Sequence, residues 1–209
     1  MVTFGPRVTE DEVFGYWLRY EYDSKPSIRT EPGFPSQLVH FILNPDHSSR
    51  EGNFWRYFVL WNYYRGGLLK ELPGRDEIDW HSATLDQSDY AELLLIASAD
   101  WRYLSNDTCL VSDCATRILK EAQRLTSMPQ YSSQVKFVFD LISKLGAGTS
   151  TDPTLILVGR RNGPYTVIDG VHRCVALFAY YFAKGNPGFA PHRVYLGVTD
   201  RKSPWQLRN

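Results

Sequence analysis

Apolar residues recur at intervals of three and four along much of the chain, which is the pattern of amphipathic helices. The first of these stretches begins with Thr9-Glu10-Asp11-Glu12, a capping box in which Thr9 is the N-cap and Glu12 reaches back to its amide. Gly66-Gly67 is the expected end of the second stretch. The pattern predicts helices over residues 9–22, 49–65, 89–99, 113–125, 134–145 and 171–184.

Shorter apolar runs predict strands. Asn162-Gly163 separates two of these runs and is a strong signal for a hairpin turn. Residues 26–37 are rich in proline and glycine and predict a loop, and Pro73-Gly74 marks the expected domain boundary. The predicted strands are 38–43, 78–85, 154–158, 165–168 and 193–198.

Together these elements predict an α+β protein with two parts. Residues 1–74 form a helical, aromatic-rich N-terminal extension, and residues 75–209 form the α+β domain. Within the extension Phe54, Phe58, Trp61 and Tyr64 recur at helical spacing. Aromatics at this spacing favour packing, with one face in the core and the other against a second unit or subunit. The alternative is a stacking platform for bases or sugars.

Charge and composition narrow the functional classes. Lys plus Arg and Asp plus Glu both number 23, so the formal charge is +0, and the hydrophobic fraction is 43%. This composition excludes wholesale disorder. The neutral balance argues against general nucleic-acid binding, although it is compatible with a local basic patch.

Cysteine and histidine usage gives little support for a zinc site. Cys109, Cys114 and Cys174 include no Cys-x-x-Cys pair, and the five histidines show no His-x-x-x-His spacing. An odd cysteine count favours a reducing compartment over a disulfide framework. Neither a signal peptide nor an apolar run of about 20 residues is evident, so a cytoplasmic protein without membrane contact is expected.

Asp169-Gly170-Val171-His172-Arg173 joins a predicted strand directly to a predicted helix. The first amides of a helix lack carbonyl partners, and the helix dipole favours negative charge there. Gly170 permits the turn and a close anion, while His172 and Arg173 supply donors. The carboxylate of Asp169 is suited to hold Mg²⁺ or to accept a proton from an attacking hydroxyl. These residues predict a phosphate or carboxylate site. In the alternative, Asp169 only caps the helix, and His172 and Arg173 face solvent.

The segment Val167-Ile168-Asp169-Gly170-Val171-His172-Arg173 resembles the signature of the ParB/sulfiredoxin superfamily, in which a strand leads to Gly-x-His-Arg at a helix start. The flanking order of helix, Gly146, strand and short hairpin agrees with it. The resemblance covers about residues 131–183. It implies a ParB/sulfiredoxin-like core in which helices flank a small mixed sheet.

Within that superfamily the Asp-Gly-x-His-Arg form resembles the free serine kinases. Sulfiredoxins carry a catalytic cysteine where this chain has Val171, and ParB proteins carry an Arg-rich motif and a helix-turn-helix that this chain lacks. The resemblance implies a phosphotransferase that uses ATP or ADP with Mg²⁺ and acts on a small hydroxylated metabolite. It implies that Gly170, Val171, His172 and Arg173 bind the phosphates, that Asp169 and His172 are catalytic, and that Asp169 holds the metal.

The kinase resemblance also implies a general base upstream of the motif, for which Asp113, Glu121 and Asp140 are the candidates. Two other functions are compatible with the sequence. One is a nucleotide-responsive binding protein, non-catalytic or hydrolytic, whose N-terminal aromatics form an interface such as that of a homodimer. The other is a DNA-binding or nuclease module.

Further polar residues have paired interpretations. Arg160-Arg161, at the hairpin tip, contacts a phosphate or nucleic acid, or is only solvated. His192-Arg193 completes the ligand pocket or belongs to an exposed loop. Trp205 closes over a base or anchors the C-terminal segment. His81 is expected to be a packed core histidine.

Overall fold

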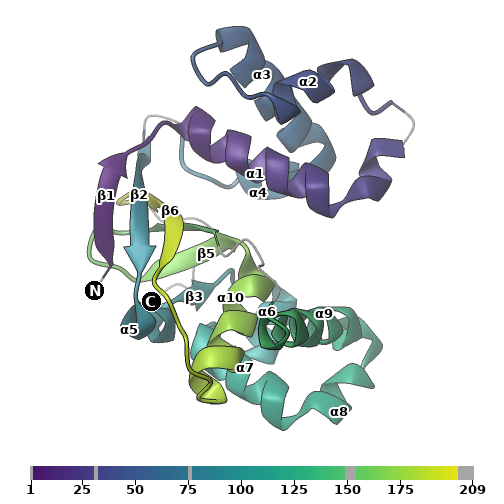
Figure 1. Ribbon diagram of the computed structural model, residues 1–209, viewed down its shortest axis with the longest axis vertical. Coiled ribbons are helices and arrows are strands. Elements are labelled where there is room, and N and C mark those ends of the chain that lie inside the picture. The colour runs from purple at the N-terminus through teal and green to yellow at the C-terminus, as the bar shows by residue number, and fades with distance from the viewer. Residues whose placement is uncertain (1, 31–32, 75–76, 149–153, 202–209) are drawn as a thin grey trace. The chain divides into compact units, whose positions relative to one another are not determined.

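The computed structural model describes residues 2–30, 33–74, 77–148 and 154–201, and within them the chain has the predicted α+β fold (Figure 1). The strands are β1 (Thr3–Arg7), β2 (Asp79–Leu85), β3 (Leu94–Leu95), β4 (Leu155–Gly159), β5 (Tyr165–Asp169) and β6 (His192–Val198). The α-helices are α1 (Glu10–Ser24), α2 (Val39–Leu43), α3 (Arg50–Val59), α4 (Gly66–Leu69), α5 (Gln87–Glu92), α6 (Ala99–Leu104), α7 (Val111–Lys120), α8 (Ala122–Thr126), α9 (Pro129–Gly146) and α10 (Val171–Leu177). The 3₁₀ segments are η1 (Pro26–Thr30) and η2 (Ser36–Leu38), and the π-helical segments are η3 (Leu60–Arg65) and η5 (Phe178–Ala183).

The strands form one mixed sheet in the order β1-β2-β6-β4-β5-β3. β4 and β5 form an antiparallel hairpin, β4 pairs with β6 in parallel, and β5 pairs with β3 in parallel. Every residue of β4 and β5 is buried. The continuous apolar run of β4 suits a strand that is covered on both faces, and β5 buries the polar residues Thr166 and Asp169 as well. The end of β5, where the sequence motif begins, therefore lies inside the fold.

The hairpin predicted at Asn162-Gly163 is confirmed. Tyr165 pairs with Gly159 at its base, and Gly163 adopts the left-handed φ of +76° that a tight connection requires of glycine. The helix predicted over 134–145 is also confirmed, although it begins earlier, at Pro129. Proline at the first helical position has no amide to leave unpaired, which explains this earlier start.

The chain divides into two compact units, each with its own buried residues. One unit comprises Arg7–Trp80, and the other combines Met1–Pro6 with His81–Asn209. The expected division at residue 74 into an N-terminal extension and an α+β domain stays a prediction. Among the described residues, no helix combines the length and the apolar character that crossing a membrane requires.

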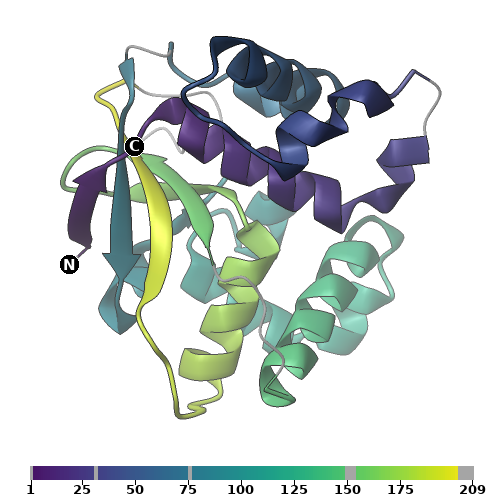
Figure 2. The same cartoon turned by 45° about the horizontal axis from the view of Figure 1, so that its top comes forward.

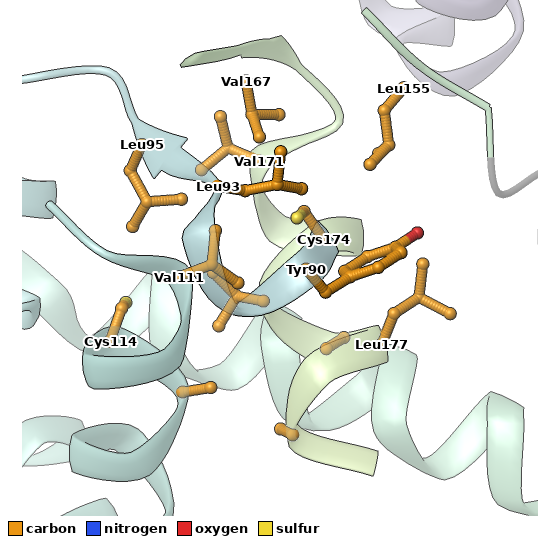
Figure 3. Close-up of a cluster of buried hydrophobic side chains, with 14 of the residues drawn as sticks. Tyr90, Leu93, Leu95, Val111, Cys114, Leu155, Val167, Val171, Cys174 and Leu177 are labelled. Carbon is orange, nitrogen blue, oxygen red and sulfur yellow. The ribbon is translucent and has the colours of Figure 1, made fainter. Parts of the chain in front are cut away.

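Helices cover the sheet in the larger unit and complete its core. α9 and α10 lie side by side in both views (Figure 1 and Figure 2). The close-up shows Tyr90 of α5 clustered with Cys174 and Leu177 of α10 (Figure 3). All three cysteines of the chain are buried and free of disulfides.

In the smaller unit the capping box of α1 is confirmed, because the Thr9 hydroxyl accepts from the Glu12 amide and the Glu12 carboxylate accepts from the Thr9 amide. The buried Glu21 carboxylate on the same helix forms ion pairs with Lys25 and Arg65. A buried charge needs such partners, and this network connects α1 to η3.

Two predictions about local structure are wrong. Residues 38–43 are helical rather than extended, since a short apolar run is compatible with either structure. The helix predicted over 89–99 ends at Glu92, and Leu94 and Leu95 instead pair with β5. The predicted end of the helix over 49–65 is confirmed, because η3 ends at Arg65 with Gly66 as its C-cap, although Gly66 has helical rather than left-handed dihedral angles and α4 begins directly at this residue.

The aromatic stretch of α3 and η3 only partly follows the expected packing. The buried residues of α3 are Gly52, Arg56 and Val59, and the Tyr57 ring stacks on Phe14 of α1 at 5.7 Å. Phe54 is 59% exposed and Phe58 is 37% exposed. The aromatic positions at 54 and 58 therefore lie on the outer face of α3 in this unit.

Candidate functional site

The sequence motif forms a sharp turn between β5 and α10. Gly170 has φ +81° and ψ 21°, the left-handed conformation in which a side chain is strained. A Cβ at this position would lie 2.6 Å from Leu155 Cδ2 and 2.9 Å from Arg173 Nη2. Glycine is thus required both by the dihedral angle and by the close approach of its neighbours.

Asp169 and Arg173 form a buried ion pair across this turn. Arg173 Nη2 donates to Asp169 Oδ2 at 2.9 Å, and the two side chains are only 4% and 1% exposed. The alternative in which Asp169 caps the helix and Arg173 faces solvent is wrong in both respects, because α10 has no side-chain cap and Arg173 is buried. The guanidinium compensates the charge of a carboxylate that has lost its contact with water.

His172 lies on the more accessible side of the same turn. Its ring is half-buried and meets two aromatic rings edge to face, Trp101 at 4.9 Å and Phe137 at 5.1 Å. Trp101 is buried, whereas Phe137 on α9 is 44% exposed. An imidazole and an exposed aromatic ring are therefore adjacent at the start of α10.

The backbone at this point is the start of a helix. The first hydrogen bond of α10 runs from the Cys174 amide to the Gly170 carbonyl at 2.8 Å. The amides of Val171, His172 and Arg173 precede that bond, at the positive end of the helix. The structure thus brings Gly170, Val171 and His172 to one turn, with Arg173 beneath them.

Tyr90 lies under this turn and has no signal in the sequence motif. Burial raises the pKa of the Tyr90 hydroxyl well above 10, Cys174 raises that pKa further, and Arg173 lowers it. Its hydroxyl contacts His192 Nδ1 at 2.8 Å, and burial lowers the pKa of His192 below 6.5. The sequence offers no spacing that would connect Tyr90 with His192, because β6 and α5 meet only in the folded chain.

The other candidates lie elsewhere. Glu121 forms ion pairs with Arg117 and Arg124 on the surface of α7 and α8. Within the described residues, neither Asp113 nor Asp140 has a hydrogen bond or an ion pair with the motif. The upstream general base therefore stays a prediction without an assigned residue.

Several of the basic and histidine candidates outside the motif lie against aromatic rings. The Arg161 guanidinium lies 5.5 Å from the centre of the Phe4 ring, and His81 meets the same ring edge to face at 5.4 Å. Arg193 lies over Tyr195, while Arg160 is exposed. His81 is half-buried rather than part of the core. Trp205 lies outside the described residues.

The described residues provide little for a metal ion. They contain no group of three or more His, Cys, Asp or Glu side chains placed to share one. Mg²⁺ is commonly held by one or two carboxylates together with substrate phosphates and water. To fill that limited role, the Asp169 carboxylate would have to bind the metal while it accepts from Arg173, or exchange that hydrogen bond for the metal.

These residues define a candidate phosphate-binding turn, in which Gly170 and His172 are half-buried and Val171, Asp169 and Arg173 are buried. Comparison with protein-family models, with curated proteins and with solved structures finds no match to this chain.

Proposed function

We propose that the chain binds the phosphate groups of ATP or ADP at the start of α10 and acts as a phosphotransferase toward a small hydroxylated metabolite. The observation that carries the proposal is the left-handed Gly170 turn, which precedes the amides of Val171 and His172 at the positive end of α10. A ParB/sulfiredoxin-like core is part of this proposal.

The ion pair beneath the turn supports anion binding. An uncompensated carboxylate at Asp169 would repel a phosphate bound a few ångströms away. Arg173 neutralises that carboxylate at 2.9 Å and leaves the helix start with a net positive field. In this arrangement Arg173 acts as a positioning residue, and His172 is the side chain that reaches the phosphate.

The neighbourhood of His172 suits a nucleotide better than a free phosphate. Phe137 is 44% exposed and meets His172 at 5.1 Å. Stacking a base on an exposed aromatic ring contributes about 1–3 kcal/mol. Phe137 thus provides a surface for the base while His172 and the amides hold phosphate oxygens. Mg²⁺ would arrive with those phosphates and spread their charge.

A second function, nucleotide binding without phosphoryl transfer, is favoured by one observation. The only carboxylate of the motif, Asp169, is 1% exposed and bound to Arg173. A general base must reach the proton that it removes. If Asp169 stays in this pair, the turn binds a nucleotide and provides no base for an acceptor hydroxyl.

The first test is thermal unfolding with ATP, ADP, CTP, pyrophosphate and adenosine, with and without Mg²⁺. A ligand at about 100 times its Kd stabilises the folded state by about 2.7 kcal/mol, which raises Tm by roughly 5–10 °C for a chain of this size. His172→Ala should reduce the shift without unfolding the protein, because the side chain is half-buried. His40→Ala, at an exposed position, is the matched control.

The outcomes separate the two functions. Nucleotide-dependent stabilisation that falls in His172→Ala, together with transfer of labelled phosphate from ATP or ADP to a hydroxylated acceptor, supports the phosphotransferase. Stabilisation without transfer to any acceptor in a broad panel supports the binding protein. If no nucleotide or pyrophosphate shifts Tm, both functions are refuted.

A further inference from the structure

The larger unit contains a cavity of about 870 Å³. Three segments that are distant in the sequence form its wall. These are the start of β1 with Val2 and Phe4, the region from α5 to Leu110, and the β4–β5 hairpin from Arg161 to Tyr165. A cavity of this size accommodates a small organic molecule.

The cavity is separate from the phosphate-binding turn. Tyr165 begins β5 and lines the cavity, whereas Asp169 ends the strand at the turn. Four residues of extended chain span about 13 Å. The motif residues 169–173 are not among the described residues that line the cavity. A ligand in the cavity is therefore recognised by other groups than those of the turn.

Much of the cavity wall is apolar. Phe4, Leu94, Leu110 and Pro164 contribute to it from four different segments. Phe4, Leu94 and Leu110 are only half-buried, so each exposes apolar surface. Removing such surface from water is favourable and requires no particular direction of approach. The wall therefore favours a ligand with an apolar body.

The two hydroxyl groups of the wall already have partners within the chain. The Tyr165 hydroxyl donates to the Arg161 carbonyl at 2.6 Å. The Thr108 hydroxyl donates to the Ser105 carbonyl at 2.9 Å and accepts from the Leu110 amide at 3.1 Å. A hydroxyl has a single hydrogen to donate. Neither group can therefore donate to a ligand while these bonds persist.

The charged residues of the wall carry both signs. Asp89 and Glu92 are acidic, and Arg161 is basic. Glu92 and Arg161 are exposed, so water solvates both side chains. A charged ligand of either sign would share the wall with at least one group of its own sign, which is unfavourable. An uncharged ligand avoids that repulsion.

We infer that this cavity binds an uncharged, predominantly apolar small molecule, which is held by apolar contact with Phe4, Leu94 and Leu110. The site does not depend on nucleotide binding at α10. It gives the chain a second class of ligand, which is recognised by shape and apolar surface rather than by charge.

A series of linear alcohols tests the inference. 1-Butanol, 1-hexanol and 1-octanol are titrated near neutral pH, and binding is followed by the methyl chemical shifts of Leu94 and Leu110. Each buried methylene group tightens binding by about four-fold, so each step of two methylenes should tighten it by about 15-fold. Hexylammonium and hexanoate, which have the same chain as 1-hexanol, should bind no more tightly than the alcohol.

Leu110→Asn removes apolar surface from the wall. Leu110 is the N-cap of α7, a position that asparagine favours, so the variant should stay folded. It should weaken 1-hexanol binding by roughly four- to 15-fold, the effect of one or two methylene contacts. Leu43→Asn makes the same change at a position that is 40% exposed in the smaller unit and should leave the affinity unchanged.

Ala91→Trp is a second variant of the wall. It places a large side chain at an exposed position that lines the cavity and should abolish binding of all three alcohols. Four results would each overturn the inference: no saturable binding of any alcohol, no increase of affinity with chain length, tighter binding of either ion than of 1-hexanol, or unchanged binding in both Leu110→Asn and Ala91→Trp.

Discussion

Replacement of Gly170 by alanine tests whether the candidate turn depends on glycine for the reasons given by its geometry. The substitution forces a side chain into φ +81°, which costs about 1–2 kcal/mol. The new Cβ would also lie 2.6 Å from Leu155 Cδ2 and 2.9 Å from Arg173 Nη2. Neither neighbour moves easily, because Leu155 is fully buried and Arg173 is held by Asp169.

Crowding of this kind in a packed interior costs about 1–3 kcal/mol, so Gly170→Ala should lower the free energy of unfolding by about 2–5 kcal/mol. Gly185→Ala is the matched control, since Gly185 has φ +69° and no atom within 4 Å of the added Cβ. It should cost only the conformational part, about 1–2 kcal/mol. Urea denaturation of both variants measures the difference from the midpoints at constant slope. If Gly170→Ala destabilises the chain no more than Gly185→Ala, the close approach does not constrain the turn.

Four further predictions follow from the contacts described above. Asp169→Asn or Arg173→Met alone should destabilise the chain by about 3–5 kcal/mol, because each leaves a buried group without its partner. The double variant, measured by urea denaturation, should cost less than the sum of the two single variants. Simple additivity of the three free energies would show that the pair is not coupled. Burial lowers the pKa of His192 in the folded state, so below pH about 6.5 the unfolded chain binds more protons than the folded chain, and the stability present above that pH should decline as the pH falls. Urea midpoints measured across this range give the slope of stability against pH, which should be mostly lost in His192→Gln. An unchanged slope in that variant would contradict the assignment to His192. Loss of the Tyr90 hydroxyl in Tyr90→Phe should itself destabilise the fold, because it leaves His192 Nδ1 without that contact, and a Tm equal to that of the wild type would refute a stabilising bond. Thr9→Ala should cost about 1 kcal/mol through loss of the N-cap, and thermal unfolding without any decrease in Tm would count against that cap.

Local features of the chain were predictable because their determinants lie within a few residues. The capping box at Thr9 and Glu12 needs only spacing and side-chain type, and the structure shows both hydrogen bonds. The hairpin around Asn162-Gly163 depends on a turn signal between two β-branched runs. The change from strand to helix at Gly170 is equally local, because a glycine must occupy the left-handed position between the two elements.

Features that depend on distant partners were not predictable in this way. Residues 93–96 carry a helix-compatible apolar run, yet Leu94 and Leu95 are extended because β5 offers them a parallel partner. The sequence places Arg173 beside His172, but only the packing of Leu155 and Asp169 around Gly170 turns the guanidinium inward and leaves the imidazole near the surface.

The sequence by itself therefore determined the α+β class, most helix and strand positions, and the strand–glycine–helix turn with its amides. Only the tertiary structure decided which motif side chains are accessible, joined Tyr90 to His192, and assembled a cavity from β1, α5 and the hairpin. The physical reason is that these two sets of features depend on interactions that act over different separations along the chain. Dihedral preferences, caps and turn residues act between neighbours, whereas burial and charge pairing depend on segments that meet only when the chain is folded.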